Sequence, residues 1–332
     1  MRIAIDGFGG DNAPAEIVKG VIEAVKVGGP KIVITGDSEL LAKEFDKYGG
    51  KPETVDIFHA PQIVEMDESP SRVVRDKKES SLVQGAQLVK EGKASAFVSA
   101  GNTGATMAAG IFVIGRIKGM DRPAIATPIP GLKRMALLVD AGANSECKPR
   151  NLVQFAKMGQ VFMEKIYSRP DPRVGLLNVG EEEKKGPPLY QEAYALLKEE
   201  GNMNFLGNIE GREIFTDLCD VVISDGFVGN VTLKVTEGAA MTLTEILKEE
   251  IKRSITSKIG ALLMKSSLKS LKNRMDYEEY GGAPLLGVKA PVIISHGSSS
   301  AKAIKNAIFV ARDMIEQEVQ KSMEELLEKT GS

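Results

Sequence analysis

The chain has 332 residues, 42% of them hydrophobic, and a formal net charge of -2. That length allows a large buried core, in one compound α/β unit or in about two domains. A nearly neutral chain without runs of interleaved basic and aromatic residues gives no reason to expect nucleic-acid binding. Its two cysteines and two histidines do not have the number or spacing of a disulfide framework or a zinc site, so we expect no metal.

The first residues form an apolar run that ends in an acid, Asp6, which indicates a first strand rather than a secretion signal. The longest apolar stretch, Met107 to Ile114, is well short of the ~20 residues that cross a bilayer. We therefore expect a cytoplasmic protein without a transmembrane helix.

Short β-rich runs alternate with longer helical patterns through the first ~225 residues, which is typical of parallel strands joined by crossover helices. The fold class is therefore α/β, and we expect a single compound domain over residues 1–332. The expected strands are Arg2 to Asp6, Lys31 to Thr35, Val55 to His59, Ala96 to Ala100, Met135 to Val139, Val174 to Asn178, Met203 to Gly207, Val221 to Ser224 and Pro291 to Ser295.

The loop Gly7 to Pro14 follows the first expected strand. It fails the dinucleotide-binding fingerprint, because the third glycine of G-x-G-x-x-G would fall at Asn12. The loop fits two interpretations equally well: a capped helix start, and a small-molecule loop at the carboxyl end of a strand. In the second interpretation Asp11 is a candidate substrate-binding residue.

The segment Phe97 to Thr106 predicts a strand end, a tight polar loop and a helix start. The loop consists of Gly101, Asn102, Thr103 and Gly104. Glycine permits backbone angles that aim successive N–H groups at one point, and a helix N-terminus adds about half a positive charge there. We interpret the loop as an anion cradle, although a turn that uses glycine because space is small explains it as well.

Basic residues crowd the segment that follows an acidic stretch at Glu65 to Ser71; they are Arg72, Arg75, Lys77 and Lys78. Such a cluster is usually a solvated face. The alternative is a docking patch for an acidic partner.

Four later loops repeat the pattern of a strand end, glycines with small polar groups, and a following helix. They are Asp140 to Asn144, Asn178 to Gly186, Ser224 to Asn230 and Ser295 to Ser300. Because parallel strands deliver their carboxyl ends to one edge of a sheet, we expect these loops to meet there. The candidate site residues among them are Asn144, Lys184, Lys185, Asp225, Gly226, Asn230, His296, Ser298 and Ser299. The lysines suit a phosphate but can also point to solvent, and the serines can be helix caps alone.

The segment Glu237 to Met275 breaks the alternation and predicts helix throughout. Its part from Ile251 onward carries seven Lys or Arg residues and no acidic one. The apolar residues lie on opposite faces of a straight helix, and a hinge at Lys265 to Ser267 would bring them together.

We therefore expect a helical insertion over residues 237–276, with protruding amphipathic arms that contact a partner subunit or a membrane surface. The alternative is a core helix with a basic solvated side. The chain then closes with one long helix, about Ser299 to Lys329.

Taken together, these motifs make the sequence resemble, from end to end, the bacterial phosphate acyltransferases of phospholipid synthesis. The motifs that carry the resemblance are Asp6 to Pro14, Ser99 to Ala105, Gly115 to Gly119 with Arg122 and Pro123, Asp140 to Asn144, Leu177 to Glu181 with Lys185 and Gly186, Asp225 to Phe227 with Gly229 to Val231, Tyr280 to Ala283, and His296 to Ser299. The sequence departs from the family at Phe8 and Asn12, where the family usually has Met and His, so we assign no acid-base role to position 12.

The resemblance implies an activity that makes acyl phosphate from acyl-acyl carrier protein and inorganic phosphate. It also implies a three-layer α/β/α fold like that of isocitrate and isopropylmalate dehydrogenases, in a homodimer that needs no nicotinamide or other cofactor. Finally, it implies peripheral membrane association through the helical arms, near the membrane glycerol-3-phosphate acyltransferase that consumes the product.

Phosphate is already an anionic nucleophile at neutral pH, so the main task of such an enzyme is to position it against a thioester carbonyl. We expect Asn102 and Thr103, with Lys185 and Ser298, to hold phosphate. The acidic carrier protein would dock on the Arg72 to Lys78 patch or on the basic arms.

The remaining roles concern the acyl group. Amides near Gly226 or Gly297, and that of Asn230, are candidate donors to the oxyanion. His296 is a candidate acid for the departing thiolate, and Asp225 a candidate to orient a donor.

Three rival hypotheses remain at this point. A covalent acyl-enzyme could form on Cys147 or Cys219, but neither lies in one of the glycine-rich loops, so we favour direct transfer. A dehydrogenase of the same fold would need clustered metal-binding carboxylates, which we do not find. A nonenzymatic membrane scaffold would leave the polar loops unexplained.

Overall fold

The computed structural model describes residues 1–275 and 277–329. Within them, a sheet of 11 strands has the order β3-β2-β1-β4-β11-β10-β5-β6-β9-β7-β8. The strands are β1 (Arg2–Asp6), β2 (Lys31–Gly36), β3 (Val55–His59), β4 (Ala96–Ser99), β5 (Ala124–Ile129), β6 (Ala136–Val139), β7 (Val174–Asn178), β8 (Phe205–Glu210), β9 (Val221–Ile223), β10 (Ala283–Leu286) and β11 (Val292–Ile294).

All nine expected strands are confirmed within a few residues, and two strands, β5 and β10, were not predicted. Each of the two contains a proline, Pro128 in β5 and Pro284 in β10. Because proline cannot donate to a strand ladder, it counts against a strand when only the sequence is read.

These two unpredicted strands reverse the sheet. The strands β3, β2, β1, β4 and β11 are parallel to one another, and so are β6, β9, β7 and β8. Between the two groups, β11 pairs with β10, β10 with β5, and β5 with β6, and all three pairings are antiparallel. An odd number of reversals makes the two parallel groups run in opposite directions.

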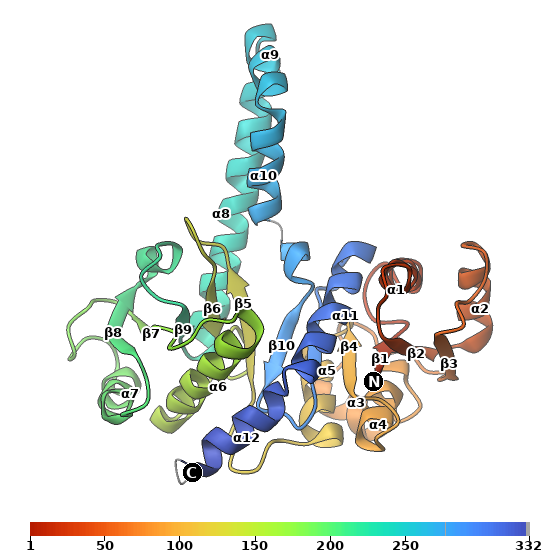
Figure 1. The fold of residues 1–332 in the computed structure, drawn as a ribbon, viewed down its shortest axis with the longest axis horizontal. Helices are drawn as coiled ribbons and strands as arrows, with labels where there is room; N and C mark the ends of the chain where they lie inside the picture. Colours follow the sequence, from red (N-terminus) through yellow and green to blue (C-terminus); the bar gives the residue numbers. More distant parts are fainter. Residues whose placement is uncertain (276, 330–332) are drawn as a thin grey trace.

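Helices cover both faces of the sheet and give three layers (Figure 1). Alternating strand residues point to opposite faces: Ile3 and Ile5 belong to one buried cluster and Ala4 to the other. The first cluster is covered by α1 (Ala15–Lys26), α2 (Ser38–Asp46), α6 (Pro149–Tyr167), α7 (Pro188–Glu199), α11 (Ala301–Glu316) and α12 (Val319–Lys329). The second is covered by α3 (Pro70–Asp76), α4 (Ser81–Lys90) and α5 (Thr103–Ala109), which continues as a π-helical turn over Gly110–Ile114.

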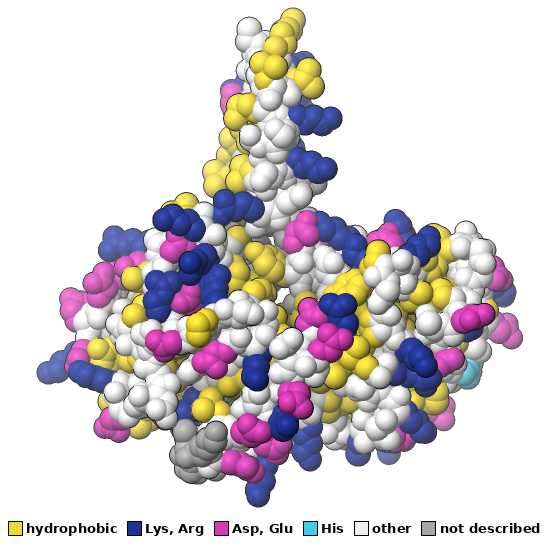
Figure 2. Space-filling view, in the orientation of Figure 1, with side chains coloured by type: hydrophobic (Ala, Val, Ile, Leu, Met, Phe, Trp, Pro, Cys, Tyr) yellow, Lys and Arg dark blue, Asp and Glu magenta, His cyan; other side chains and the backbone are white. Residues whose placement is uncertain are grey.

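A long helix, α8 (Gly226–Lys252), rises from the body, and α9 (Ile255–Leu263) and α10 (Lys265–Met275) run back beside it (Figure 1). None of the residues of α9 is buried, and Leu263 is 80% exposed. In Figure 2 apolar side chains gather at the tip of this projection and basic ones along its side. We call the projection, residues 237–275, the arm.

The helix expected over the arm is interrupted twice. The first break follows Lys252, where Ser254 caps α9 by accepting the Ser257 amide at 3.0 Å. The second falls at Met264, directly before the expected hinge. Residue 276, where the expected insertion ends, lies outside the described residues.

The single closing helix was a wrong prediction. It divides into α11 and α12 at Gln317 and Glu318, and Glu318 has a positive φ of 50°. Across the described part of the chain, none of the helices combines the length and apolarity that spanning a bilayer requires.

The contact between α1 and α11 depends on Gly20, because a Cβ there would lie 2.7 Å from the Ala301 carbonyl oxygen and 2.7 Å from the Ile304 Cβ. We predict that Gly20→Ala lowers the free energy of unfolding by about 1–3 kcal/mol through overpacking. Gly238 lies on the exposed surface of α8, and none of the described residues comes within 4 Å of such a Cβ there. Gly238→Ala should therefore leave stability unchanged or raise it, since alanine favours helix. Urea unfolding of both variants tests this, and equal effects would contradict the packing.

Candidate active site

The reversal of the sheet separates the glycine-rich loops into two groups. The loops after β1, β4 and β11, residues 7–14, 100–104 and 295–300, form what we call the Ser99 loop cluster. The loops after β6, β7 and β9, residues 140–147, 179–187 and 224–230, form the Asp140 loop cluster. The expectation that all of them share one edge of the sheet is wrong, because the strand ends that carry the two groups point in opposite directions.

The Ser99 loop cluster is organised by a buried carboxylate, Asp6, which is 2% exposed. The Ser99 hydroxyl donates to Asp6 Oδ2 at 2.8 Å and accepts the Gly101 amide at 3.0 Å, while the Phe8 amide donates to Asp6 Oδ1 at 3.3 Å. Burial raises the pKa of Asp6, and the hydrogen bonds that it accepts oppose the rise. The first two loops are therefore tied to each other through one side chain at the end of β1.

Glycine is required where these loops touch. A Cβ on Gly9 would lie 2.6 Å from Asp6 Oδ2 and 2.7 Å from the Gly101 nitrogen. Gly10 has a φ of +101°, and a Cβ on it would lie 2.8 Å from the Gly297 carbonyl oxygen. That same carbonyl accepts the Asp11 amide at 2.8 Å, which joins the third loop to the first.

The Asn102 side chain is already fully engaged. Its Nδ2 donates to the Met66 carbonyl at 2.7 Å and to the Glu68 carbonyl at 3.1 Å, and its Oδ1 accepts the Ala105 amide at 2.9 Å as the cap of α5. This side chain holds the loop rather than offering its amide to phosphate. Thr103, in contrast, is exposed at the first residue of α5.

Gly104 follows at the same helix start, and a Cβ on it would lie 2.5 Å from Pro70 Cγ.

The second helix start of this cluster belongs to α11. His296 Nδ1 lies 2.8 Å from Ser298 Oγ and accepts the Ser298 amide at 3.2 Å. Ser299 is 4% exposed, and its hydroxyl is buried without a hydrogen-bond partner in the described part of the structure.

An orphaned buried hydroxyl normally costs about 1–3 kcal/mol, so it calls for an explanation such as a ligand. The amides of the first turn of α11 point out of the helix beside Ser299, where an anion is favoured. One of them, that of Ala301, is occupied by Glu16 Oε2 at 2.6 Å.

The Asp140 loop cluster has its own buried carboxylate. Asp140, 0% exposed, directly follows β6, and burial raises its pKa against the hydrogen bonds that it accepts. Asp140 Oδ2 accepts the backbone amide and the Nδ2 of Asn144, both at 2.8 Å. Its Oδ1 accepts the amides of Ile125, Gly142 and Ala143. Asn144 Nδ2 also donates to the Pro123 carbonyl at 2.7 Å, so its side chain is structural.

Asp225 caps the long helix α8. Its Oδ1 accepts the Phe227 amide at 2.9 Å and the Val228 amide at 3.0 Å, and its Oδ2 accepts the Tyr190 hydroxyl at 2.6 Å. Burial, with the neighbouring Asp225 carboxylate, raises the pKa of Tyr190, which keeps the hydroxyl protonated as a donor. The Gly226 amide donates to the Asn144 carbonyl at 2.7 Å and is not available to an oxyanion.

The lysine loop extends from β7 in the same half of the sheet. Asn178 Nδ2 donates to the Lys185 carbonyl and Gln191 Nε2 to the Lys184 carbonyl, both at 3.0 Å. The Lys185 ammonium lies 3.8 Å from Glu182 Oε1, with both side chains at least half exposed.

The candidate site residues thus divide between the two clusters. Those in the Ser99 loop cluster are Asp11, Gly101, Asn102, Thr103, Gly104, His296, Ser298 and Ser299. Those in the Asp140 loop cluster are Asn144, Lys184, Lys185, Asp225, Gly226 and Asn230; the Asn230 side chain would lie 3.4 Å from a Cβ on Gly142. In the described residues no group of three or more His, Cys, Asp or Glu side chains is arranged to hold a metal ion.

The roles of Ser99, Asp140 and Tyr190 were not predicted from the sequence. Ser99 and Asp140 stand beside glycine-rich loops, and that position was an available signal. Tyr190 carried none, because it lies in the ordinary helix α7 and reaches Asp225 only through the fold.

Comparison with known proteins identifies the family. A model of the family described as "Fatty acid synthesis protein" matches residues 1–322. The chain is 52% identical over 318 residues to a phosphate acyltransferase of Pelotomaculum thermopropionicum, covering 95% of this chain and 92% of that one. It is 48% identical over 330 residues to a phosphate acyltransferase of Dictyoglomus turgidum, covering 99% and 98%. The chain belongs to the phosphate acyltransferase family.

Solved structures show that the α/β fold is shared with other phosphotransacylases. A phosphotransacetylase from Streptococcus pyogenes superposes with a TM-score of 0.65 at 18% identity, over 95% of this chain and 94% of that one. A 4-hydroxythreonine-4-phosphate dehydrogenase from Klebsiella pneumoniae gives 0.52 at 14% identity, over 94% and 98%. At these identities the likeness concerns the fold alone.

Family membership makes the chain a transferase, and this removes the nonenzymatic scaffold from the hypotheses.

The structure bears on the acyl-enzyme alternative through the position of Cys147. Contrary to expectation, Cys147 lies in a strand-end loop, three residues after Asn144. Its Sγ is 3.6 Å from the Asn144 carbonyl oxygen. Burial, followed by the negative charges of Asp140 and Asp225, raises the Cys147 pKa to about 11. Because the thiolate is the nucleophile, this environment makes Cys147 a poor acyl acceptor.

We predict that iodoacetamide does not alkylate Cys147 in the folded protein at neutral pH, and that labelling rises only as the pH approaches 11. Mass spectrometry of labelled peptides measures this, with the urea-unfolded protein as the positive control. Rapid labelling of the folded protein at pH 7 would restore the covalent mechanism.

Proposed function

We propose that the enzyme transfers a fatty acyl group from the thioester of acyl carrier protein to inorganic phosphate, so that the acyl phosphate feeds phosphatidic acid and phospholipid synthesis. Family membership supports acyl transfer to phosphate. The observation that carries the assignment of the phosphate site is the buried, unpartnered Ser299 hydroxyl at the start of α11.

In the proposed mechanism a phosphate oxygen attacks the thioester carbonyl carbon, a tetrahedral oxyanion forms, and the C–S bond breaks to give acyl phosphate and a thiolate that takes up one proton. Ser299 holds phosphate with the amides of the first turn of α11 other than that of Ala301, which Glu16 occupies. Thr103 with the Gly104 amide approaches it from α5. Asn102 acts by fixing this loop. A carboxylate repels phosphate, so Asp11 is better suited to a polar group of the acyl donor.

We propose His296 as the acid for the thiolate. The donating form is the imidazolium, because a neutral imidazole is a weaker acid than the thiol that forms. After the transfer the neutral ring accepts the Ser298 amide at Nδ1, as in the structure. Asp225, held by Tyr190, acts as a positioning residue through α8. Lys184, Lys185 and the Asn230 amide belong to the Asp140 loop cluster, so we assign them no contact with the reacting carbonyl. They stay candidates for binding a remote part of the acyl donor.

We propose more specifically that the fold has the architecture of isocitrate and isopropylmalate dehydrogenases and that the enzyme works without their nicotinamide cofactor. The likeness to a dehydrogenase structure supports it. The helical insertion over residues 237–276 would then be an addition to the compound domain. Deleting the arm and measuring unfolding of the remainder tests that division.

We propose further that the enzyme is a homodimer and contacts the membrane peripherally, near the membrane glycerol-3-phosphate acyltransferase. Phe227, Val231 and Val235, four residues apart on α8, are 66%, 47% and 65% exposed and form an apolar stripe for a second copy. At the tip of the arm, Leu262 and Leu263 are 69% and 80% exposed for insertion among lipids. Sedimentation with and without vesicles tests both contacts.

The decisive experiment incubates the protein with long-chain acyl carrier protein and phosphate and analyses the products. The proposal expects acyl phosphate and free carrier protein. No acyl phosphate, together with hydride transfer to a nicotinamide, would establish the dehydrogenase alternative instead.

We predict that Ser299→Ala raises the phosphate KM about 10-fold or more, because it removes one donor to the anion. The unfolding temperature should stay unchanged or rise, since the hydroxyl has no partner to lose. Ser99→Ala is the matched control: its hydroxyl bonds Asp6 and Gly101, so it should lower the unfolding temperature. An unchanged phosphate KM in Ser299→Ala would remove this residue from the site.

We propose that the acidic carrier protein docks through Arg72 and Lys78. Within the sequence-predicted patch, Arg75 is paired with Asp76 at 2.7 Å and Lys77 is paired with Glu68. Arg72 and Lys78 are therefore the more available cations. Charge reversal at both should raise the carrier-protein KM several-fold and leave the phosphate KM alone. Reversal of Lys26 and Lys43, exposed on α1 and α2, is the control. Equal effects of the two double variants would rule the patch out.

A further inference from the structure

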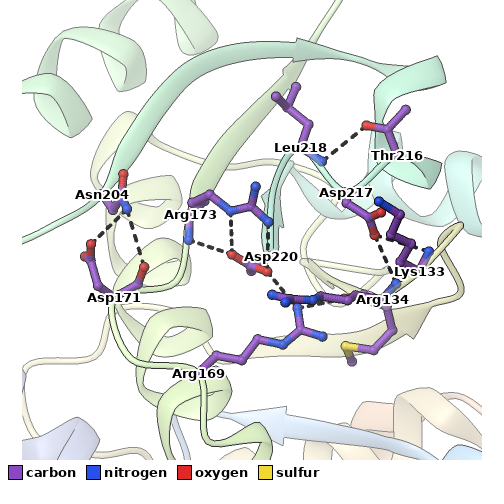
Figure 3. Close-up of polar contacts among 11 residues, drawn as sticks. Lys133, Arg134, Arg169, Asp171, Arg173, Asn204, Thr216, Asp217, Leu218 and Asp220 are labelled. Atoms are coloured by element: carbon purple, nitrogen blue, oxygen red, sulfur yellow. Dashed lines mark hydrogen bonds and ion pairs between the residues drawn. The ribbon is translucent and has the colours of Figure 1, made fainter.

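A basic hollow lies outside both loop clusters. It has a volume of about 530 Å³ and is formed by the segments that precede β6, β7 and β9, at the amino ends of these strands (Figure 3). The Asp140 loop cluster follows the carboxyl ends of the same strands, so the two lie at opposite ends. Its charged lining residues are Lys133, Arg134, Arg169, Asp171, Arg173, Asp217 and Asp220.

Two guanidinium groups are fixed on one carboxylate. Arg169 Nη1 donates to Asp220 Oδ1 at 2.7 Å, and Arg173 Nε donates to Asp220 Oδ2 at 2.9 Å (Figure 3). The Asp220 side chain is only 7% exposed, whereas those of Arg169 and Arg173 are 19% and 34% exposed. Two cations around one anion leave a positive charge, and both arginines line the hollow.

Two further cations stand opposite. Asp217 Oδ1 accepts the backbone amides of Lys133 at 3.2 Å and Arg134 at 3.0 Å, so this carboxylate fixes the loop. The remaining acid, Asp171, accepts Asn204 Nδ2 at 2.9 Å. The side chains of Lys133 and Arg134 are exposed, and the contacts described for them include no acidic partner. Four cations and three acids thus line the hollow, which leaves one net positive charge, and each acid is held by hydrogen-bond donors.

The hollow also adjoins the arm. Arg274 Nη2 in α10 donates to the carbonyls of Gly131 at 3.0 Å and Leu132 at 2.5 Å, directly before Lys133. The Leu132 side chain is 72% exposed. Figure 2 shows basic side chains gathered on the body beside the base of the arm. An anionic group in the hollow would therefore have an apolar side chain next to it.

We propose that this hollow binds the phosphate group of a phosphomonoester, with Lys133, Arg134, Arg169 and Arg173 as its ligands. Planar guanidinium forks match phosphate oxygens, and a dianion needs more than one cation. A hollow of this volume has the size of a small-molecule site rather than of a surface for a folded domain. The phosphate belongs either to a soluble phosphomonoester or to a lipid headgroup, and the proposal is independent of the catalytic assignment above.

The test compares wild type with Lys133→Ala/Arg134→Ala, whose exposed side chains can be removed without unpairing Asp220. Lys26→Ala/Lys43→Ala is the control of equal charge. Calorimetric titration with glycerol 2-phosphate probes the soluble source. Co-sedimentation with phosphatidylcholine vesicles, with and without phosphatidic acid, probes the lipid source. Thermal unfolding confirms that each variant is folded.

The proposal expects one of the two probes to bind wild type and the control, and to bind the hollow variant at least about 10-fold more weakly. The phosphate KM of acyl phosphate formation should stay the same in that variant, and Ser299→Ala should keep probe binding. Absence of binding by either probe, or equal binding in both double variants, would overturn the proposal. So would a change confined to the carrier-protein KM, which would make the surface a protein dock.

Discussion

Three antiparallel pairings in the middle of the sheet determine where the chemistry of this protein lies. They are made by β5 and β10, and they turn one parallel group of strands against the other. Each group delivers its own glycine-rich loops to the carboxyl ends of its strands. The molecule therefore has two polar loop clusters, and a basic hollow lies at the opposite ends of the strands of the second group.

Both clusters use the same physical device, a buried carboxylate at the end of a central strand. Asp6 binds Ser99 and the Phe8 amide, and Asp140 accepts four backbone amides and the Asn144 side chain. Burying a charge is costly, and it is tolerated because each oxygen has donors. In contrast to these satisfied carboxylates, the hydroxyls of Ser299 and Ser300 at the start of α11 are buried without a hydrogen-bond partner among the described residues.

The sequence predicted the α/β class, the loops and the nine strands with regular apolar patterns, because these depend on local periodicity and turn chemistry. It could not predict the reversal of strand direction, because Pro128 and Pro284 count against a strand assignment for β5 and β10, which cause it. Nor could it show that the Asn102 side-chain amide donates to the Met66 and Glu68 carbonyls, or that the Tyr190 hydroxyl donates to Asp225. Such contacts join distant parts of the chain. The family motifs supplied the activity, which composition and spacing alone left open.

The most direct test of the central claim is a crystal structure with inorganic phosphate bound at a concentration that supports turnover. The account predicts phosphate oxygens within hydrogen-bond distance of Ser299 Oγ, beside the first turn of α11 and Thr103. Phosphate found only among the loops around Asp140 and Asp225, with the Ser299 hydroxyl still unpartnered, would contradict it.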